Sequence, residues 1–168
     1  PTPMNANEKL TAKDGTELTD AREYRSLIGK LIYLTHTRPD ICFAVGMLSR
    51  FMHCPTKHHF GAAKRILRYI AGTKDLGLWY YQGQDHVLKA FTDSDWARSL
   101  DDRKSTTGNC FFLGTSIIAW SSKKQSTVAL SSAEAEYVAA TSAACQVVWL
   151  RRLLGDLGQQ QLTATQVF

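Results

Sequence analysis

The spacing of apolar residues changes at Gly72, and this change constrains the fold more than any other feature of the 168-residue chain. Before Gly72, large apolar residues recur every three or four positions, which places them on one face of an α-helix. After Gly72, short apolar and aromatic runs alternate with turn-forming residues, a pattern typical of β-strands. The sequence therefore predicts a helical part followed by a part that contains a sheet.

Three helices are predicted in the first part, because each has its own start or stop signal. Asp20 begins a capping box that opens the first helix, and Pro39 interrupts that helix. The second helix follows Pro39 and ends at Pro55, where Thr56 caps the third. These short amphipathic helices predict a small, thumb-like bundle over residues 20–75.

The second part, residues 76–168, predicts an α/β (α+β) fold. A turn is expected at Gln82–Asp85, and Ser131 and Glu134 form a second capping box whose helix runs to about Gly155. Three strands are expected before this helix and one after it: Val87–Trp96, Thr107–Gly114, Ile117–Ser121 and then Gln161–Phe168. We expect the first three strands to be antiparallel and the last to run parallel to the first.

Composition narrows the setting of the chain. The 20 basic and 15 acidic side chains give a net charge of +5, and a hydrophobic fraction of 44% is enough to build a core without disulfide or metal. No apolar run approaches the roughly 20 residues that a membrane span needs, so no membrane partner is expected. The polar residues 1–19 predict a mobile tail and lack the apolar core of a signal peptide.

The four cysteines lie far apart and include no C-x-x-C pair. This arrangement suits buried thiols in a reducing compartment better than a disulfide framework. The first residue is not methionine, which suggests a fragment or a processed product.

Two groups of carboxylates stand out. Asp93 and Asp95 lie at the end of an apolar strand, and Glu134 and Glu136 lie in the first turns of the Ala-rich helix. Glu134 is explained as the capping-box partner and Asp95 as a solvated strand-end residue, which leaves Glu136 free to face the sheet near Asp93. Converging carboxylates repel each other unless a cation lies between them, so the pair predicts bound Mg²⁺ or Mn²⁺.

Basic residues form the other candidate site. Lys57, Lys64, Arg65 and Arg68 recur along one face of the third predicted helix, a face that could lie along the phosphates of nucleic acid. The alternative is a solvated helix face with no ligand. Arg103, Lys104, Lys123 and Lys124 could extend the positive track across the sheet part.

Several long motifs resemble one known family. Leu88–Ala97 (LKAFTDSDWA), Ile118–Gln125 (IAWSSKKQ) and Val128–Ala139 (VALSSAEAEYVA) closely resemble the ribonuclease H region of copia-type retrotransposon polyproteins. Tyr24–Tyr33 (YRSLIGKLIY) and Thr37–Ala44 (TRPDICFA) resemble the segment between that family's reverse transcriptase and ribonuclease H. The resemblance extends from about Glu23 to the end of the chain and implies a thumb- or connection-like segment followed by a ribonuclease H-like domain.

The resemblance implies a two-metal nuclease that cleaves the RNA strand of RNA–DNA hybrids. Asp93 matches the family's first metal-binding aspartate, and Glu136 matches the glutamate on the first long helix. The family's third ligand is an aspartate just after the fourth strand, but no aspartate follows Asp156 here. We therefore expect a ribonuclease H-like domain that is incomplete at its C-terminal side, with little or no activity in this chain alone.

A function of a different class also fits the sequence: a domesticated, non-catalytic module that binds nucleic acid or protein. Its binding surfaces would be the basic helix, which would contact duplex or hybrid, and a sheet edge left open by missing strands, which also predicts self-association. An inert relic is a third possibility. The family and the thiol pattern together predict a location in the cytoplasm or nucleus.

Overall fold

A computed structural model describes residues 2–5, 8–83 and 86–168, and the chain divides into two compact units. The first unit comprises residues 1–77 together with the loop 99–103, and the second comprises residues 78–98 and 104–168. The turn expected at Gln82–Asp85 lies partly outside the described residues.

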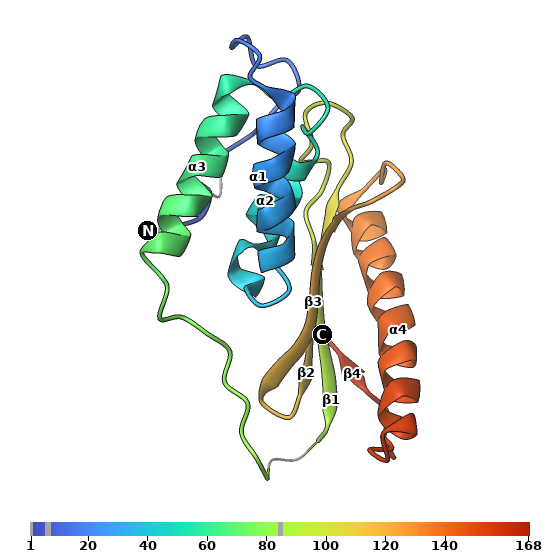
Figure 1. Ribbon diagram of the computed structural model, residues 1–168. Helices are drawn as coiled ribbons and strands as arrows, with labels where there is room; N and C mark the ends of the chain where they lie inside the picture. Colours follow the sequence, from blue (N-terminus) through green and yellow to red (C-terminus); the bar gives the residue numbers. More distant parts are fainter. Residues whose placement is uncertain (1, 6–7, 84–85) are drawn as a thin grey trace. The chain divides into compact units, whose positions relative to one another are not determined.

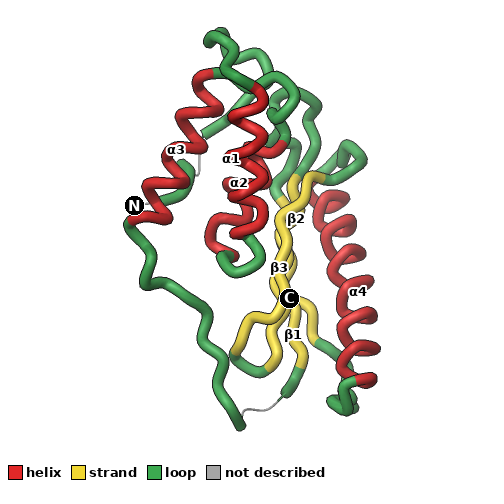
Figure 2. Tube along the Cα trace, viewed as in Figure 1, coloured by secondary structure: helices red, strands yellow, loops and turns green. Residues whose placement is uncertain are grey.

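The first unit is helical (Figures 1 and 2). Its helices are α1 (Ala21–Leu34), α2 (Cys42–Ser49) and α3 (Lys57–Ala71), and a 3₁₀ turn over Pro39–Ile41 precedes α2. The predicted caps are confirmed: the Asp20 carboxylate accepts hydrogen bonds from the backbone N–H groups of residues 22 and 23, and the Thr56 hydroxyl accepts one from the N–H of residue 59. These side chains satisfy N–H groups that a helix leaves unpaired at its start.

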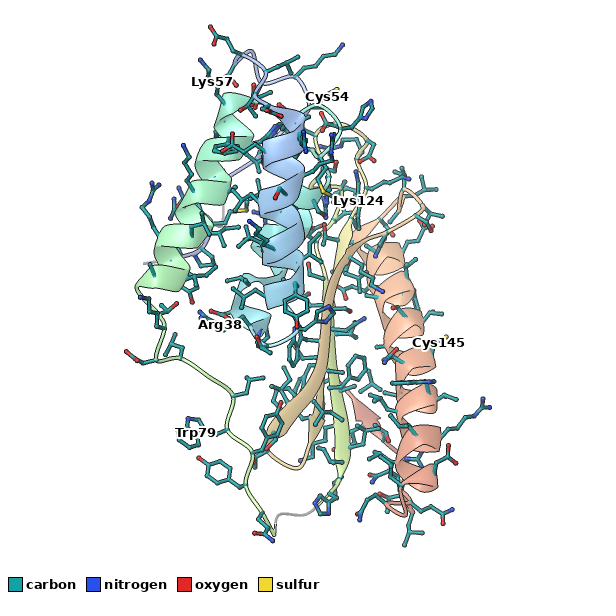
Figure 3. All side chains as sticks on the ribbon, in the orientation of Figure 1. Arg38, Cys54, Lys57, Trp79, Lys124 and Cys145 are labelled. Atoms are coloured by element: carbon teal, nitrogen blue, oxygen red, sulfur yellow. The ribbon has the colours of Figure 1, made fainter. Side chains whose placement is uncertain are left out.

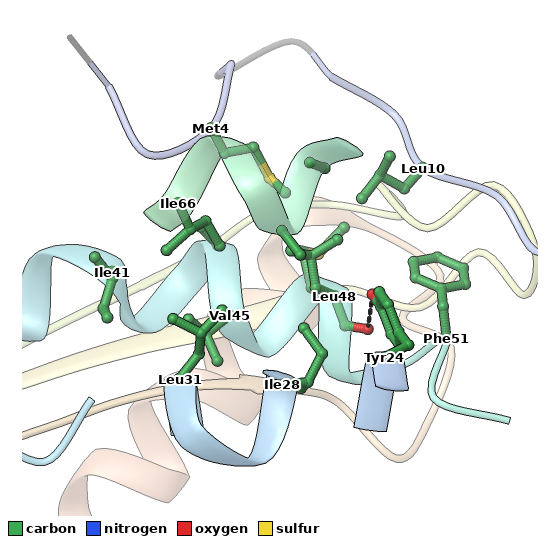
Figure 4. Close-up of a cluster of buried hydrophobic side chains, with 14 residues drawn as sticks. Met4, Leu10, Tyr24, Ile28, Leu31, Ile41, Val45, Leu48, Phe51 and Ile66 are labelled. Carbon is green, nitrogen blue, oxygen red and sulfur yellow. Dashed lines mark hydrogen bonds between the residues drawn. The ribbon is translucent and has the colours of Figure 1, made fainter. Parts of the chain in front are cut away.

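All three helices contribute to one apolar core (Figure 4). Its largest fully buried side chains include Tyr24 and Ile28 from α1, Leu48 from α2 and Ile66 from α3. The Tyr24 hydroxyl donates a 2.9 Å hydrogen bond to the Leu48 carbonyl oxygen, so its polar end is satisfied inside the core. Burying each of these aliphatic side chains contributes about 1.5–3 kcal/mol, and this burial holds the short helices together.

Residues 2–5 and 8–19, here called the N-terminal strap, pack against this helical core. Met4 and Leu10 are only 8% and 4% exposed and belong to the core (Figure 4). The Thr19 N–H donates to the Pro55 carbonyl oxygen at 2.9 Å, which fixes the end of the strap beside the start of α3. This differs from the mobile tail expected from the sequence, because two isolated apolar residues in a polar segment produce no periodic signal.

The Thr-Arg-Pro-Asp motif forms a structural network within the first unit. The Arg38 guanidinium donates two hydrogen bonds to the Asp40 carboxylate, at 2.7 and 2.9 Å, and also donates to Thr73. The Tyr69 hydroxyl donates to the same carboxylate at 2.8 Å. The guanidinium holds the pKa of Asp40 below its usual value. The motif therefore ties the α1–α2 connection to α3.

The second unit contains a mixed four-stranded sheet and one long helix, as the sequence predicts. The strands are β1 (Leu88–Ser94), β2 (Thr106–Leu113), β3 (Ser116–Lys124) and β4 (Gln166–Val167), in the spatial order β3-β2-β1-β4. β1–β2 and β2–β3 are antiparallel, and β4 runs parallel to β1.

β4 is much shorter than the predicted Gln161–Phe168. Side-chain hydrogen bonds replace the strand ladder before it: Gln161 accepts from the Leu88 N–H at 2.9 Å, and Arg151 donates to the Thr163 carbonyl oxygen at 2.7 Å.

Helix α4 (Ser132–Asp156) covers one face of this sheet (Figure 1). Ala135, Ala139 and Ala143 are fully buried along one side of the helix, and their small side chains allow close approach to a neighbouring element. Further along, larger residues of α4 form a cluster with sheet residues Leu88, Ala90 and Phe111; the helix residues are Val147, Leu150 and Leu154. The change from small to large side chains along α4 follows its contact with the sheet.

The four cysteines are free thiols, as expected, but the prediction that they are buried is wrong for two of them. Cys54 and Cys145 are exposed, whereas Cys42 and Cys110 are half-buried. Burial raises the pKa of the Cys110 thiol.

None of the described helices combines the length and the apolar character that crossing a membrane would require.

Candidate metal and nucleic-acid site

Asp93 lies near the C-terminal end of β1 and is exposed. Strand side chains alternate between the two faces of a sheet, and Leu88 and Ala90 pack in a cluster with α4. Thr92 and Ser94 follow them on that face, so Asp93 leaves the strand on the opposite face, next to its end. Its carboxylate has no hydrogen-bond or ion-pair partner within the described part of the chain.

The neighbouring carboxylate, Asp95, has a structural role. It accepts a 2.7 Å hydrogen bond from the Thr106 N–H, and the Asp95 N–H donates to the Thr106 carbonyl oxygen at 3.2 Å. This reciprocal pair closes the end of the β1–β2 ladder. It differs from the solvated carboxylate expected from the sequence, and it leaves Asp93 as the aspartate of this motif that is available to a ligand.

Glu136 lies in the second turn of α4 and is exposed. The cap at Ser131 is confirmed, because its hydroxyl accepts from the Glu134 N–H at 3.1 Å. The Glu134 carboxylate reaches back to the Leu130 N–H at 2.7 Å and is therefore engaged in the local structure. Glu136 has no such engagement with any described residue, which agrees with the distinction drawn between the two glutamates from the sequence.

The buried side chain of Gln125 connects the two elements that carry Asp93 and Glu136. Its Nε2 lies 3.1 Å from the Ser94 hydroxyl and 2.9 Å from the Ala135 carbonyl oxygen, and it also contacts the Thr107 hydroxyl at 3.0 Å. Ser94 and Ala135 are the chain neighbours of Asp93 and Glu136. One amide group thus holds the end of β1 beside the first turns of α4, a role that sequence reasoning did not detect.

These carboxylates alone do not make a preformed metal cage. Among the described residues, no group of three or more histidine, cysteine, aspartate or glutamate side chains is placed to hold a metal ion. Two unengaged carboxylates still fit the chemistry of Mg²⁺ or Mn²⁺, because these ions take oxygen ligands and keep several waters when bound to one or two carboxylates.

The four predicted basic residues of α3 have different surroundings. Lys57 (Figure 3) forms an ion pair with Glu17, and Arg65 donates to the Thr2 hydroxyl at 2.9 Å and to its carbonyl oxygen at 3.2 Å. The Lys64 ammonium lies 4.8 Å from the centre of the Phe60 ring, a cation–π contact. Arg68 is exposed and forms no ion pair with any described residue.

Lys64 also lines a groove of about 540 Å³ between α1 and α3. Its floor includes Leu27, Phe60 and Leu67, and Lys30 adds a second ammonium. The available positive charge of α3 therefore lies over Lys64 and Arg68, further along the helix than Lys57.

Lys123 and Lys124 belong to the second unit, at the end of β3 (Figure 3 labels Lys124). Lys123 is exposed and Lys124 is half-buried. They lie opposite Thr107 and Thr106 of β2 in the register of the ladder, and they form a basic site separate from the residues of α3.

These features define an α+β protein with two unengaged carboxylates beside a sheet end and a separate basic helix. Comparison with known proteins identifies its lineage. The chain is 47% identical over 159 residues, 95% of its length, to the retrovirus-related Pol polyprotein from transposon RE2 of Arabidopsis thaliana. It is 48% identical over 139 residues, 82% of its length, to the corresponding polyprotein from transposon TNT 1-94 of Nicotiana tabacum. It spans only 11% and 10% of the lengths of these two relatives.

A shorter relative is matched over most of its own length. The secreted RxLR effector protein 161 of Plasmopara viticola is 44% identical over 128 residues, which make up 90% of that protein and 76% of this chain. No protein-family model and no solved structure matches the chain. The chain belongs to the family of copia-type retrotransposon Pol polyproteins.

Proposed function

We propose that the second unit is part of a ribonuclease H domain that acts on the RNA strand of RNA–DNA hybrids during reverse transcription. The observation that carries this proposal is the Gln125 bridge, which holds the chain neighbours of Asp93 and Glu136 together. The strand order β3-β2-β1-β4 with one covering helix fits a ribonuclease H-like fold.

Asp93 and Glu136 are the residues that would hold Mg²⁺ or Mn²⁺. Because Asp93 leaves β1 on the face opposite α4, the shared ligand position would lie beyond the end of the strand, where both carboxylates are open to water. In such a site, bound cations activate a water molecule and stabilise the leaving oxygen of the phosphodiester. The protein's own contribution is to fix the two carboxylates through β1, α4 and Gln125.

Metal binding tests this site directly. Titration of Mn²⁺ into the protein should broaden the NMR signals of residues near the ends of β1 and α4, and Asp93→Asn or Glu136→Gln should weaken the effect at least tenfold. Asp156→Asn, at the exposed far end of α4, is the matched control and should behave as the wild type. Equal broadening in all four proteins would refute the proposed site.

Cleavage is a separate measurement. The family pattern includes a third carboxylate that these residues do not provide, so we expect the 168-residue chain to cleave an RNA–DNA hybrid weakly or not at all with Mg²⁺. Cleavage at a rate typical of an enzyme, lost in both Asp93→Asn and Glu136→Gln, would contradict this expectation and at the same time confirm the two ligands.

The basic residues extend the proposal to nucleic-acid contact by the first unit. Lys57, Lys64, Arg65 and Arg68 would contact the phosphates of a hybrid or duplex, and Lys123 and Lys124 would do so from the second unit. Support comes from α3, where Lys64 and Arg68 are exposed on one side of the helix. The test is fluorescence anisotropy with a labelled RNA–DNA hybrid: Lys64→Ala/Arg68→Ala should weaken binding and flatten its salt dependence.

A further inference from the structure

The N-terminal strap places acidic groups against the basic helix of its own chain. Glu17 forms an ion pair with Lys57. The two ring nitrogens of His58 face two different carboxylates of the strap, with Nε2 lying 3.5 Å from Glu8 and Nδ1 lying 3.4 Å from Asp14. The sequence shows no acidic residue within α3, and the structure supplies these charges from residues 40 or more positions away.

The strap is anchored independently of these charges. The buried side chains of Met4 and Leu10 hold its first half in the apolar core. Its second half is fixed by backbone, because the Lys57 N–H donates to the Glu17 carbonyl oxygen at 2.8 Å and an isolated antiparallel bridge joins Leu18 to Thr56. The acidic side chains are therefore held in place rather than attracted from solution.

Asp14 occupies the place at the start of α3 that favours an anion. Its carboxylate accepts a 2.6 Å hydrogen bond from the Thr56 hydroxyl, and this bond together with those from Thr16 lowers its pKa, so that it is charged at neutral pH. The start of a helix carries partial positive charge and exposed N–H groups, which commonly bind phosphate. A carboxylate of the strap fills this position.

We propose that the N-terminal strap is an internal competitor for nucleic acid, with its carboxylates in the place of phosphates along the first turns of α3. The strap engages Lys57, His58 and Arg65 and leaves Lys64 and Arg68 as the groups that first meet a hybrid. This inference rests on the proposed contact between α3 and nucleic acid. It adds that the affinity of this contact is held down by residues 8–17 of the same chain.

The strength of the ion pair makes such competition possible. The side chains of Lys57 and Glu17 are 67% and 78% exposed, and exposed pairs of this kind contribute about 0–1 kcal/mol. Each phosphate contact that a protein gains makes the logarithm of the binding constant steeper in the logarithm of salt concentration by about 0.9, which corresponds to about eightfold in affinity at 0.1 M salt.

The test compares hybrid binding by the full chain with and without the competing charges. In Glu8→Gln/Glu17→Gln the strap keeps its apolar anchors and Asp14 keeps its bond to Thr56. The control, Asp75→Asn/Asp156→Asn, removes the same charge from two exposed positions outside the strap. Binding of a labelled RNA–DNA hybrid is measured by anisotropy over a range of salt concentrations, and circular dichroism verifies that each variant is folded.

We expect the strap variant to bind about eightfold more tightly at 0.1 M salt, with a slope steeper by about one, and the control to follow the wild type. Equal affinities of the strap variant and the wild type would overturn the inference, as would an equal gain in the control. Failure of the proposed function has a different signature: Lys64→Ala/Arg68→Ala would bind as the wild type does, or no variant would bind the hybrid at low salt.

Discussion

Replacing Tyr24 with phenylalanine removes one oxygen atom from the core of the first unit and tests how that core is held. The Tyr24 side chain is fully buried, and its hydroxyl donates to the Leu48 carbonyl oxygen at 2.9 Å (Figure 4). Burial raises the pKa of this hydroxyl well above its usual value, so it is a donor at every physiological pH. The ring stays in place in Tyr24→Phe, and only the hydrogen bond is lost.

The size of the effect follows from what becomes of the acceptor. Leaving a buried carbonyl group without a partner costs about 1–3 kcal/mol, but Leu48 also accepts from the Phe51 N–H at 3.1 Å. The carbonyl oxygen therefore remains paired in the variant, and the loss is that of one net hydrogen bond. We expect Tyr24→Phe to lower the free energy of unfolding of the first unit by about 1 kcal/mol.

Urea unfolding measured by two probes is the assay. All four tryptophans (Trp79, Trp96, Trp120 and Trp149) belong to the second unit, so their fluorescence follows that unit, while circular dichroism also follows the helices of the first. Tyr33→Phe is the matched control, because Tyr33 is 80% exposed. The reasoning is refuted if Tyr24→Phe leaves the dichroism transition unchanged, or if Tyr33→Phe shifts it as far.

Three further changes test other local features. Lowering the pH from about 7.5 to about 5 should destabilise the first unit, because burial lowers the pKa of His59 and the unfolded chain then binds a proton that the folded one does not; urea titrations of His59→Gln should lack this dependence and those of His36→Gln should keep it. Arg103→Gly should raise the melting temperature measured by calorimetry, because Arg103 has a φ of 56° and relief of that strain is worth about 1 kcal/mol; an unchanged or lower value would contradict this. Gln125→Leu should destabilise the second unit by about 1–3 kcal/mol in tryptophan fluorescence, because the Ala135 carbonyl oxygen loses its side-chain donor, and a neutral effect would remove the bridge from the argument.

The helix starts were predictable because capping is local. Asp20, Thr56 and Ser131 each lie directly before an amphipathic segment, and each accepts a backbone N–H within the next three residues. The strap was not predictable in this way. Met4 and Leu10 contact residues that are distant in the chain, so their burial depends on tertiary packing rather than on any repeat in the sequence.

The candidate site was predictable in part. The capping argument separates Glu134 from Glu136 on sequence alone, and the structure shows Glu134 in a local hydrogen bond. The bond from Thr106 to Asp95 and the bridge by Gln125 both join residues from different strands or helices. Such contacts depend on strand register, which a single sequence does not determine.

The parallel pairing of β4 with β1 has a consequence for the order in which the second unit folds. Only Lys89–Gln166 and Ala90–Val167 are paired, and Phe168 adds two backbone hydrogen bonds, to Ala90 at 3.0 Å and from Thr92 at 2.9 Å. The partners come from opposite ends of the unit, so this closure carries the largest loop entropy, whereas the β2–β3 hairpin closes locally. We expect the hairpin to form early and β4 to dock last, which leaves the backbone edge of β1 open to other chains while the protein is being synthesised.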